Sequence, residues 1–150
     1  MLVALLVLSF ASCGTQNVAK SGTATVVIEN RDKSFTSYDV DLSLVENREE
    51  GALSLLEHIA SLEGSTLYFS TTYGGGYGAY VASIGSLTPA AGEYVALYTT
   101  NESDFAIPTE WAPTVKTALY GEKTLTFSGV GISSMNIEDG TVVLFRIETY

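Results

Sequence analysis

The 150-residue sequence predicts an α+β fold, a β-grasp-like mixed sheet with one helix packed on one face. Two observations carry this prediction. A β-branched run and an alternating segment come first and form a hairpin, and one amphipathic helical segment follows them. Several short strand-like segments then continue to the C-terminus. The order of hairpin, helix and further strands is the order of a β-grasp domain.

The hairpin is predicted from residues 23–29 and 38–44. The first segment is rich in β-branched residues, which favour strands. The second alternates apolar and polar residues, as expected of a strand with one buried face. The polar residues 30–33 form the turn between them.

The helix is predicted to begin near Asn47, which is expected to cap it, with Glu49 and Glu50 in the first turn. Its apolar residues recur at i, i+3, i+4 and i+7, and Gly64 is expected to end it in a left-handed conformation. His58 is the only histidine. With no second ligand at helical spacing, it is predicted to be a surface or boundary residue rather than a metal ligand.

Five further strands are predicted at residues 67–72, 80–84, 94–100, 125–127 and 141–147. Between them, residues 101–123 contain two of the three prolines and the only tryptophan, Trp111. A loop this long inside a compact domain usually has a role, so an ordered excursion is expected. Its acidic residues Glu102 and Asp104 are expected to be solvated.

The first twelve residues are uncharged and apolar, and they are too few for a membrane span of about 20 residues. They are predicted to be a signal peptide (1–12). The following Ala11-Ser12-Cys13 resembles a bacterial lipobox, so Cys13 is predicted to carry a lipid at the start of a polar tether (13–22). The domain proper is predicted to span 23–150. These features predict an extracytoplasmic protein that its N-terminal lipid anchors to the bacterial cell membrane.

Composition excludes several function classes. Seventeen acidic residues against seven basic ones give a net charge of −10, which disfavours nucleic acid as a partner. A single cysteine excludes an intramolecular disulfide and a cysteine-based zinc site. The sequence shows no metal-ligand cluster and no serine–histidine–aspartate set at a recognisable spacing. We therefore expect no enzyme activity, no catalytic residue, no bound metal and no required cofactor.

The stretch TTYGGGYGAYVASIGSL, residues 71–87, alternates tyrosine and glycine. Two interpretations compete: a hairpin turn whose tyrosines cover the sheet, or a contact surface. In the second, glycine lets backbone amides approach a ligand and tyrosine supplies a flat face with a polar tip. The predicted ligand-binding residues are Gly75, Gly76, Tyr77, Gly78, Tyr80 and Tyr94.

The same stretch predicts local conformation. Gly78 is expected to need φ > 0 or close packing that forbids a Cβ atom. Tyr77 is expected to be partly exposed, whereas alternation from the start of the strand directs Tyr80 into the core.

Residues 23–150 resemble the bacterial domains related to the C-terminal β-domain of transcobalamin and intrinsic factor. The resemblance rests on the segment 77–87, on the strand opening at Tyr94, and on the acidic-glycine turn Asp139-Gly140 before the last strand. Tyr77 stands where vertebrate members tend to have tryptophan, and Ser86 replaces a late glycine. Residues 101–127 are longer than the short turn common in that family.

The resemblance implies a domain that lies over one face of cobalamin, although these residues are too few to enclose so large a ligand alone. The expected function is capture of a corrinoid or another small ligand for a membrane importer. The alternative left open is a cell-surface adhesion or assembly module that binds a protein or glycan through the same tyrosines. A shared fold does not decide between them.

Overall fold

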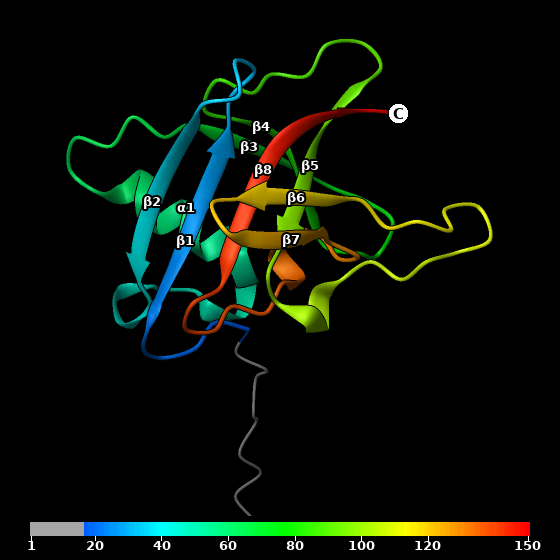
Figure 1. Cartoon of the computed structure of the whole chain (residues 1–150). Coiled ribbons are helices and arrows are strands. Elements are labelled where there is room, and N and C mark those ends of the chain that lie inside the picture. The colour runs from blue at the N-terminus through cyan, green and yellow to red at the C-terminus, as the bar shows by residue number, and fades with distance from the viewer. Residues whose placement is uncertain (1–16) are drawn as a thin grey trace, which may run out of the picture.

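The structure is a computed structural model that describes residues 17–150, and it confirms the α+β fold. Six strands form one mixed sheet in the order β2-β1-β8-β5-β7-β6, and two more form a separate antiparallel pair, β3-β4 (Figure 1). The strands are β1 (Thr23–Glu29), β2 (Phe35–Asp41), β3 (Phe69–Tyr73), β4 (Ala79–Ile84), β5 (Glu93–Thr99), β6 (Thr117–Tyr120), β7 (Lys123–Phe127) and β8 (Val142–Thr149).

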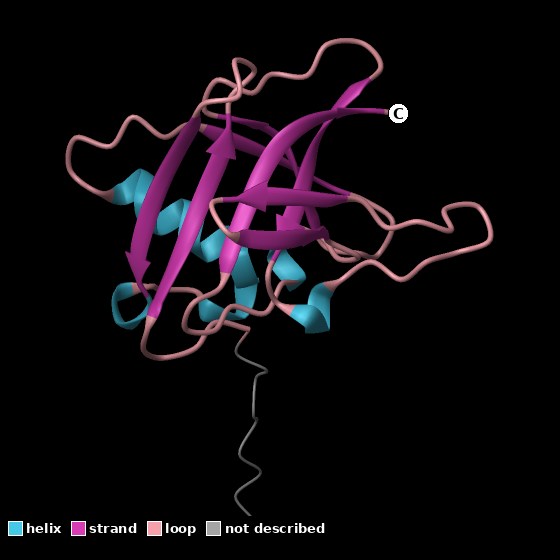
Figure 2. Cartoon of the chain, viewed as in Figure 1, coloured by secondary structure: helices cyan, strands magenta, loops and turns pink. Residues whose placement is uncertain are grey.

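The one α-helix among residues 17–150, α1 (Gly51–Ser61), lies on one side of the large sheet (Figure 2). Short 3-10 turns flank the strands at η1 (Leu42–Leu44), η2 (Arg48–Glu50), η3 (Glu102–Asp104) and η4 (Ile132–Ser134). No helix among residues 17–150 is long and apolar enough to cross a membrane.

The centre of the sheet has β-grasp connectivity. β1 pairs antiparallel with β2 and parallel with the C-terminal strand β8, and β8 then pairs antiparallel with β5. The central strands are therefore the first and the last of the domain. Because both are rich in β-branched and apolar residues, they are buried on both faces over most of their length.

One core fills the space between α1, the sheet and the β3-β4 pair. The helix contributes the predicted apolar stripe to it. The core residues from the helix and the strands include Val26, Ile28, Val40, Leu55, Leu56, Ile59, Val81, Ile84, Val143 and Phe145.

A second core lies on the opposite face of the sheet, where the β6-β7 hairpin crosses over β8 and β5 (Figure 1). Its buried members are Val27, Ala96, Tyr98, Ala118, Leu125, Val142 and Leu144. The expected excursion at 101–123 is therefore partly a structural element. It contains η3 and the strand β6, which the sequence analysis did not predict, and it gives the sheet its half-barrel shape.

Several expectations are wrong in detail. The second strand begins at Phe35 and ends at Asp41, and the chain then turns into η1 instead of continuing to residue 44. Asn47 adopts a left-handed conformation without a side-chain capping bond. Asp104 is 3% exposed rather than solvated, because it accepts hydrogen bonds from the Asn136 backbone N–H (2.7 Å) and side-chain amide (2.9 Å).

Residues before position 23 also pack and hydrogen-bond within the fold. The Asn17 N–H donates to the Arg48 carbonyl (3.1 Å), the Ala19 N–H donates to the Ile137 carbonyl (2.8 Å), and Val18 is buried between them. Residues 17–22 therefore belong to the domain and not to a tether. The predicted signal peptide and Cys13, which is predicted to carry a lipid, lie outside the described residues.

Candidate functional site

The glycine-rich loop joins β3 to β4, and hydrogen bonds attach its last residues to η4. Gly78 has φ +92°, and a Cβ atom there would lie 2.6 Å from the hydroxyl oxygens of Ser133 and Ser134, so both parts of its prediction are confirmed. Next to it, the Ala79 N–H donates to Ser133 Oγ (2.8 Å), and the Tyr77 carbonyl accepts from the Gly131 N–H (2.8 Å). These bonds attach the end of the loop to η4.

The rest of the loop is open. Gly75 and Gly76 also have positive φ values, +68° and +75°, and a Cβ atom at Gly76 would meet nothing within 4 Å. Tyr77 is 60% exposed, as expected.

The expected inward orientation of Tyr80 is wrong. Its ring is 45% exposed, whereas its neighbours Ala79 and Val81 are buried. Strand β4 begins one residue earlier than predicted, so alternation sends the odd-numbered side chains inward here. The bulge at Ala82 lies further along the strand, so it does not change the face on which Tyr80 lies.

Tyr80 lines a groove of about 520 Å³ between β4 and the start of β5. Across from it, Tyr94 packs on Tyr150 with ring centroids 4.9 Å apart and the rings tilted by 35°. The groove is lined by Thr72, Tyr80, Val81, Ala82, Pro89, Glu93, Tyr94, Val95 and Tyr150. A smaller cavity of about 120 Å³ lies along β5 beyond Val95, and Phe127, Val130 and Ile132 give it an apolar lining.

Backbone groups of β5 also face this groove. The Tyr150 N–H donates to the Gly92 carbonyl and the Thr100 N–H to the Val142 carbonyl, both at 3.1 Å, so the even-numbered residues of β5 direct their peptide groups toward β8. The peptide groups of Val95 point the other way. Among residues 17–150 they have no hydrogen-bond partner, which leaves one donor and one acceptor at the groove.

The negative charge of Glu93, at the rim of the groove, is balanced by an ion pair with Arg31. Arg31 donates to both of its carboxylate oxygens (3.1 and 2.7 Å), and the Ala90 N–H donates to one of them (2.7 Å). The Arg31 hydrogen bonds, reinforced by the Ala90 N–H, lower the pKa of Glu93 from its ordinary 4.5 to about 2. The groove therefore offers tyrosine faces, hydroxyls and peptide groups, with one carboxylate already paired.

A hydrogen-bonded network of charged and polar side chains lies at the second core, beside the groove. The Tyr98 hydroxyl donates to Glu148 (2.7 Å), and Arg146 donates to Glu148 (2.6 Å) while its guanidinium lies 4.5 Å from the centroid of the Tyr98 ring. Burial alone would raise the pKa of Glu148, but the hydrogen bonds from Tyr98 and Arg146 lower it. This network ties β5 to β8 beside Tyr94.

The structure thus brings together two of the predicted residues, Tyr80 and Tyr94. Gly75, Gly76, Tyr77 and Gly78 lie in the adjoining loop and do not line the groove. Sequence reasoning missed Tyr150 and Glu93. The antiparallel register of β5 and β8 places Tyr150 there, and a pairing of the last predicted strand with residues 94–100 would have signalled it.

Residues 17–150 contain no group of three histidine, cysteine or acidic side chains arranged to hold a metal ion. His58 is half-buried on α1, where it lines a polar hollow of about 260 Å³ with Glu46, Glu57 and Ser61.

Comparison with known proteins gives a similarity of fold. No family model matches the chain, and no curated protein matches it. Among solved structures, it is similar to a "putative metal binding protein" from Ruminococcus gnavus ATCC 29149, with a TM-score of 0.52 and 10% sequence identity. The match covers 86% of this chain and 98% of that one, and at this identity it concerns the fold alone.

Proposed function

We propose that this protein is an extracytoplasmic, lipid-anchored binding protein with a transcobalamin-like domain, which captures a corrinoid or another flat small molecule in the groove between β4 and β5. The observation that carries the proposal is the groove itself, a hollow of about 520 Å³ that Tyr80 and the packed pair Tyr94 and Tyr150 line together. Small-molecule sites are typically concave and largely apolar, with a few placed polar groups.

The chemistry of the groove suits an uncharged, planar ligand. Tyrosine rings offer flat faces of low conformational entropy, and their hydroxyls remain available at the edges. Because Arg31 already pairs with Glu93, the rim presents no free charge from either group. The peptide group of Val95 adds one donor and one acceptor, which match the amide groups of a ligand edge.

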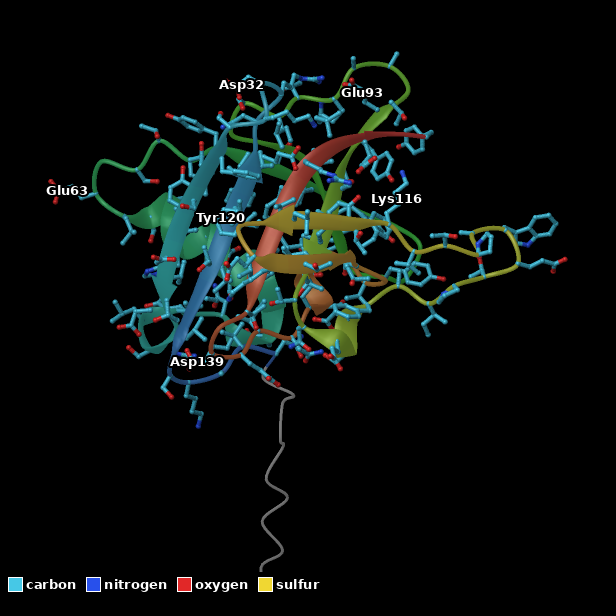
Figure 3. The ribbon with its side chains drawn as sticks, viewed as in Figure 1. Asp32, Glu63, Glu93, Lys116, Tyr120 and Asp139 are labelled. Carbon is cyan, nitrogen blue, oxygen red and sulfur yellow. The ribbon has the colours of Figure 1, made fainter. Side chains whose placement is uncertain are left out.

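The position of the groove is consistent with capture from outside the cell. Asn17, the first residue that the structure describes, is hydrogen-bonded to Ile137, close in sequence to Asp139 at one end of the sheet, and Glu93 marks the rim of the groove at the other end (Figure 3). If Cys13 carries a lipid, the groove opens on the side away from the membrane.

The neighbour from Ruminococcus gnavus is described as a "putative metal binding protein". We carry only a binding role from it to this chain, since residues 17–150 provide no cluster of metal ligands. A corrinoid brings its own metal and would need none.

The test is retention of cyanocobalamin by the purified protein after desalting, followed by its visible absorption. Tyr80→Ala and Tyr94→Ala should each weaken retention by about tenfold or more, because each removes an aromatic wall. Tyr68→Ala is the matched control: Tyr68 is 80% exposed and lies outside the groove, so retention should be unchanged.

A parent protein that retains no cyanocobalamin would exclude the corrinoid. The proposal of a small-molecule site would then require a flat ligand of another class, whose binding depends on Tyr80 and Tyr94 in the same way. If the two substitutions abolish capture of a surface protein or glycan instead, the protein is an adhesion or assembly module.

A further inference from the structure

The outer edge of β2 is open along its whole length. The Leu42 N–H donates to the Gly22 carbonyl (2.9 Å) and the Asn30 N–H to the Ser34 carbonyl (2.8 Å), which fixes the pairing of β2 with β1. In an antiparallel pair, alternate residues direct their peptide groups to the partner strand. The even-numbered residues of β2 therefore face β1, and the odd-numbered residues face away from the sheet.

The outward peptide groups belong to Phe35, Ser37, Asp39 and Asp41. The peptide groups of Phe35, Ser37 and Asp39 and the N–H of Asp41 have no hydrogen-bond partner among residues 17–150, and all four residues are exposed. The Asp41 carbonyl is the exception, because Asp41 is the N-cap of η1 and its carbonyl accepts the first hydrogen bond of that turn. The other outward groups form a row of free donors and acceptors over a seven-residue strand. Such an edge is a template on which another extended chain can pair.

The side chains along this row carry a charge pattern. Asp39 and Asp41 are two residues apart on the face opposite α1, and neither forms an ion pair within the described part of the chain. The cations that do form ion pairs there, Arg31, Lys33, Lys116 and Arg146, are paired with glutamates. The edge therefore presents two uncompensated negative charges with strand spacing.

Hydrogen bonds keep these carboxylates in place. Asp41 accepts from the Ser43 N–H (2.9 Å) and hydroxyl (2.6 Å), and these bonds lower its pKa. Asp39 accepts from the Thr25 hydroxyl (2.9 Å). At the other end of the row, Phe35 is 46% exposed and contacts Tyr120 edge-on, with centroids 5.3 Å apart.

We propose that the β2 edge binds an extended segment of a partner protein that carries lysine or arginine at alternate positions. Antiparallel addition would place two basic side chains opposite Asp41 and Asp39 and an apolar side chain against Phe35. Charge complementarity selects this occupant over a second copy, because two chains of net charge −10 repel each other. The proposal is independent of the groove between β4 and β5.

The probe is the peptide Ac-Lys-Thr-Lys-Val-Thr-Val-Leu-NH2, designed to pair antiparallel from Asp41 to Phe35. Its binding should slow hydrogen exchange of the Ser37, Asp39 and Asp41 amides, measured by NMR. A peptide with glutamate in place of both lysines should bind about tenfold more weakly, because two exposed ion pairs become repulsions.

Two variants of the protein complete the test. Asp39→Lys with Asp41→Lys should reverse the preference between the two peptides, whereas Glu63→Lys with Glu110→Lys changes net charge equally and should leave the preference for the lysine peptide. Ser37→Pro removes an outward N–H without breaking a bond to β1, and should abolish binding while the protein stays folded.

Absence of protection at these amides, equal binding of both peptides, or undiminished binding to folded Ser37→Pro would overturn the proposal. Protection of these amides that appears without peptide and rises with protein concentration would also overturn the proposal. The edge would then be an interface between copies of this chain.

Discussion

Arg31 and Glu93 form a two-pronged ion pair that joins the β1-β2 turn to the first residue of β5. The two guanidinium nitrogens lie 3.1 and 2.7 Å from the two carboxylate oxygens, and Arg31 also donates to the Thr88 carbonyl (2.9 Å). These contacts fix the rim of the tyrosine groove. Because the pair links residues 62 apart in sequence, its strength should influence the stability of the domain.

Removal of this pair should change how stability depends on pH. The folded-state pKa of Glu93, about 2, lies below its ordinary 4.5. The pair therefore stabilises the fold above about pH 4.5 and loses that contribution as the pH falls toward 2. Glu93→Gln should flatten the melting temperature against pH in this window. An identical slope in parent and variant would show that the pair contributes nothing.

Three glycine-to-alanine substitutions should separate the cost of a left-handed backbone from the cost of a steric clash at the Cβ atom. Gly74→Ala should be nearly neutral, since Gly74 has neither a positive φ nor a neighbour within 4 Å. Gly76→Ala should cost about 1–2 kcal/mol for its left-handed backbone. Gly78→Ala should cost more, because its Cβ atom must also displace Ser133 and Ser134. Urea denaturation measures all three, and equal costs at positions 76 and 78 would contradict the packing argument.

The β6-β7 hairpin should prove to be part of the fold. Leu125→Ala removes a fully buried side chain from the second core and should lower the free energy of unfolding by about 2–4 kcal/mol. Leu119→Ala, on the same hairpin but 66% exposed, should change it by less than about 0.5 kcal/mol. Similar values for the two variants would mean that the hairpin does not pack on the sheet.

Lipidation gives a direct test of the expected location. Cys13→Ser should yield a soluble or uncleaved protein that incorporates no labelled fatty acid. A variant that still enters the detergent phase with a labelled acyl chain would exclude the predicted lipid anchor.

Much of the architecture could be predicted because local sequence determines it. Residues 23–29 form β1 as predicted, since their β-branched side chains favour a buried strand. Strand β6 and its pairing with the predicted strand at 125–127 were missed, although Gly121-Glu122 between two alternating segments is a two-residue turn signal. The burial of Asp104 could not be predicted, because it depends on Asn136, 32 residues further along the chain.

The candidate site was predictable only in its residue type. The sequence predicted a tyrosine-rich contact surface, and two of its tyrosines, Tyr80 and Tyr94, line one groove. Which face Tyr80 takes depends on the first residue of β4, and a shift of one residue reverses it. The contribution of Tyr150 depends on the register of β8 against β5, which is a long-range property.

The hydrogen bonds that join Asn17 to Arg48 and Ile137 limit how far a lipid-anchored form could move. Four peptide units separate Cys13 from Asn17, and a fully extended chain of that length spans only about 14 Å. The domain would therefore stay within one protein radius of the bilayer surface. Its encounters with a membrane partner would become a two-dimensional search at high local concentration, in which weak contacts suffice.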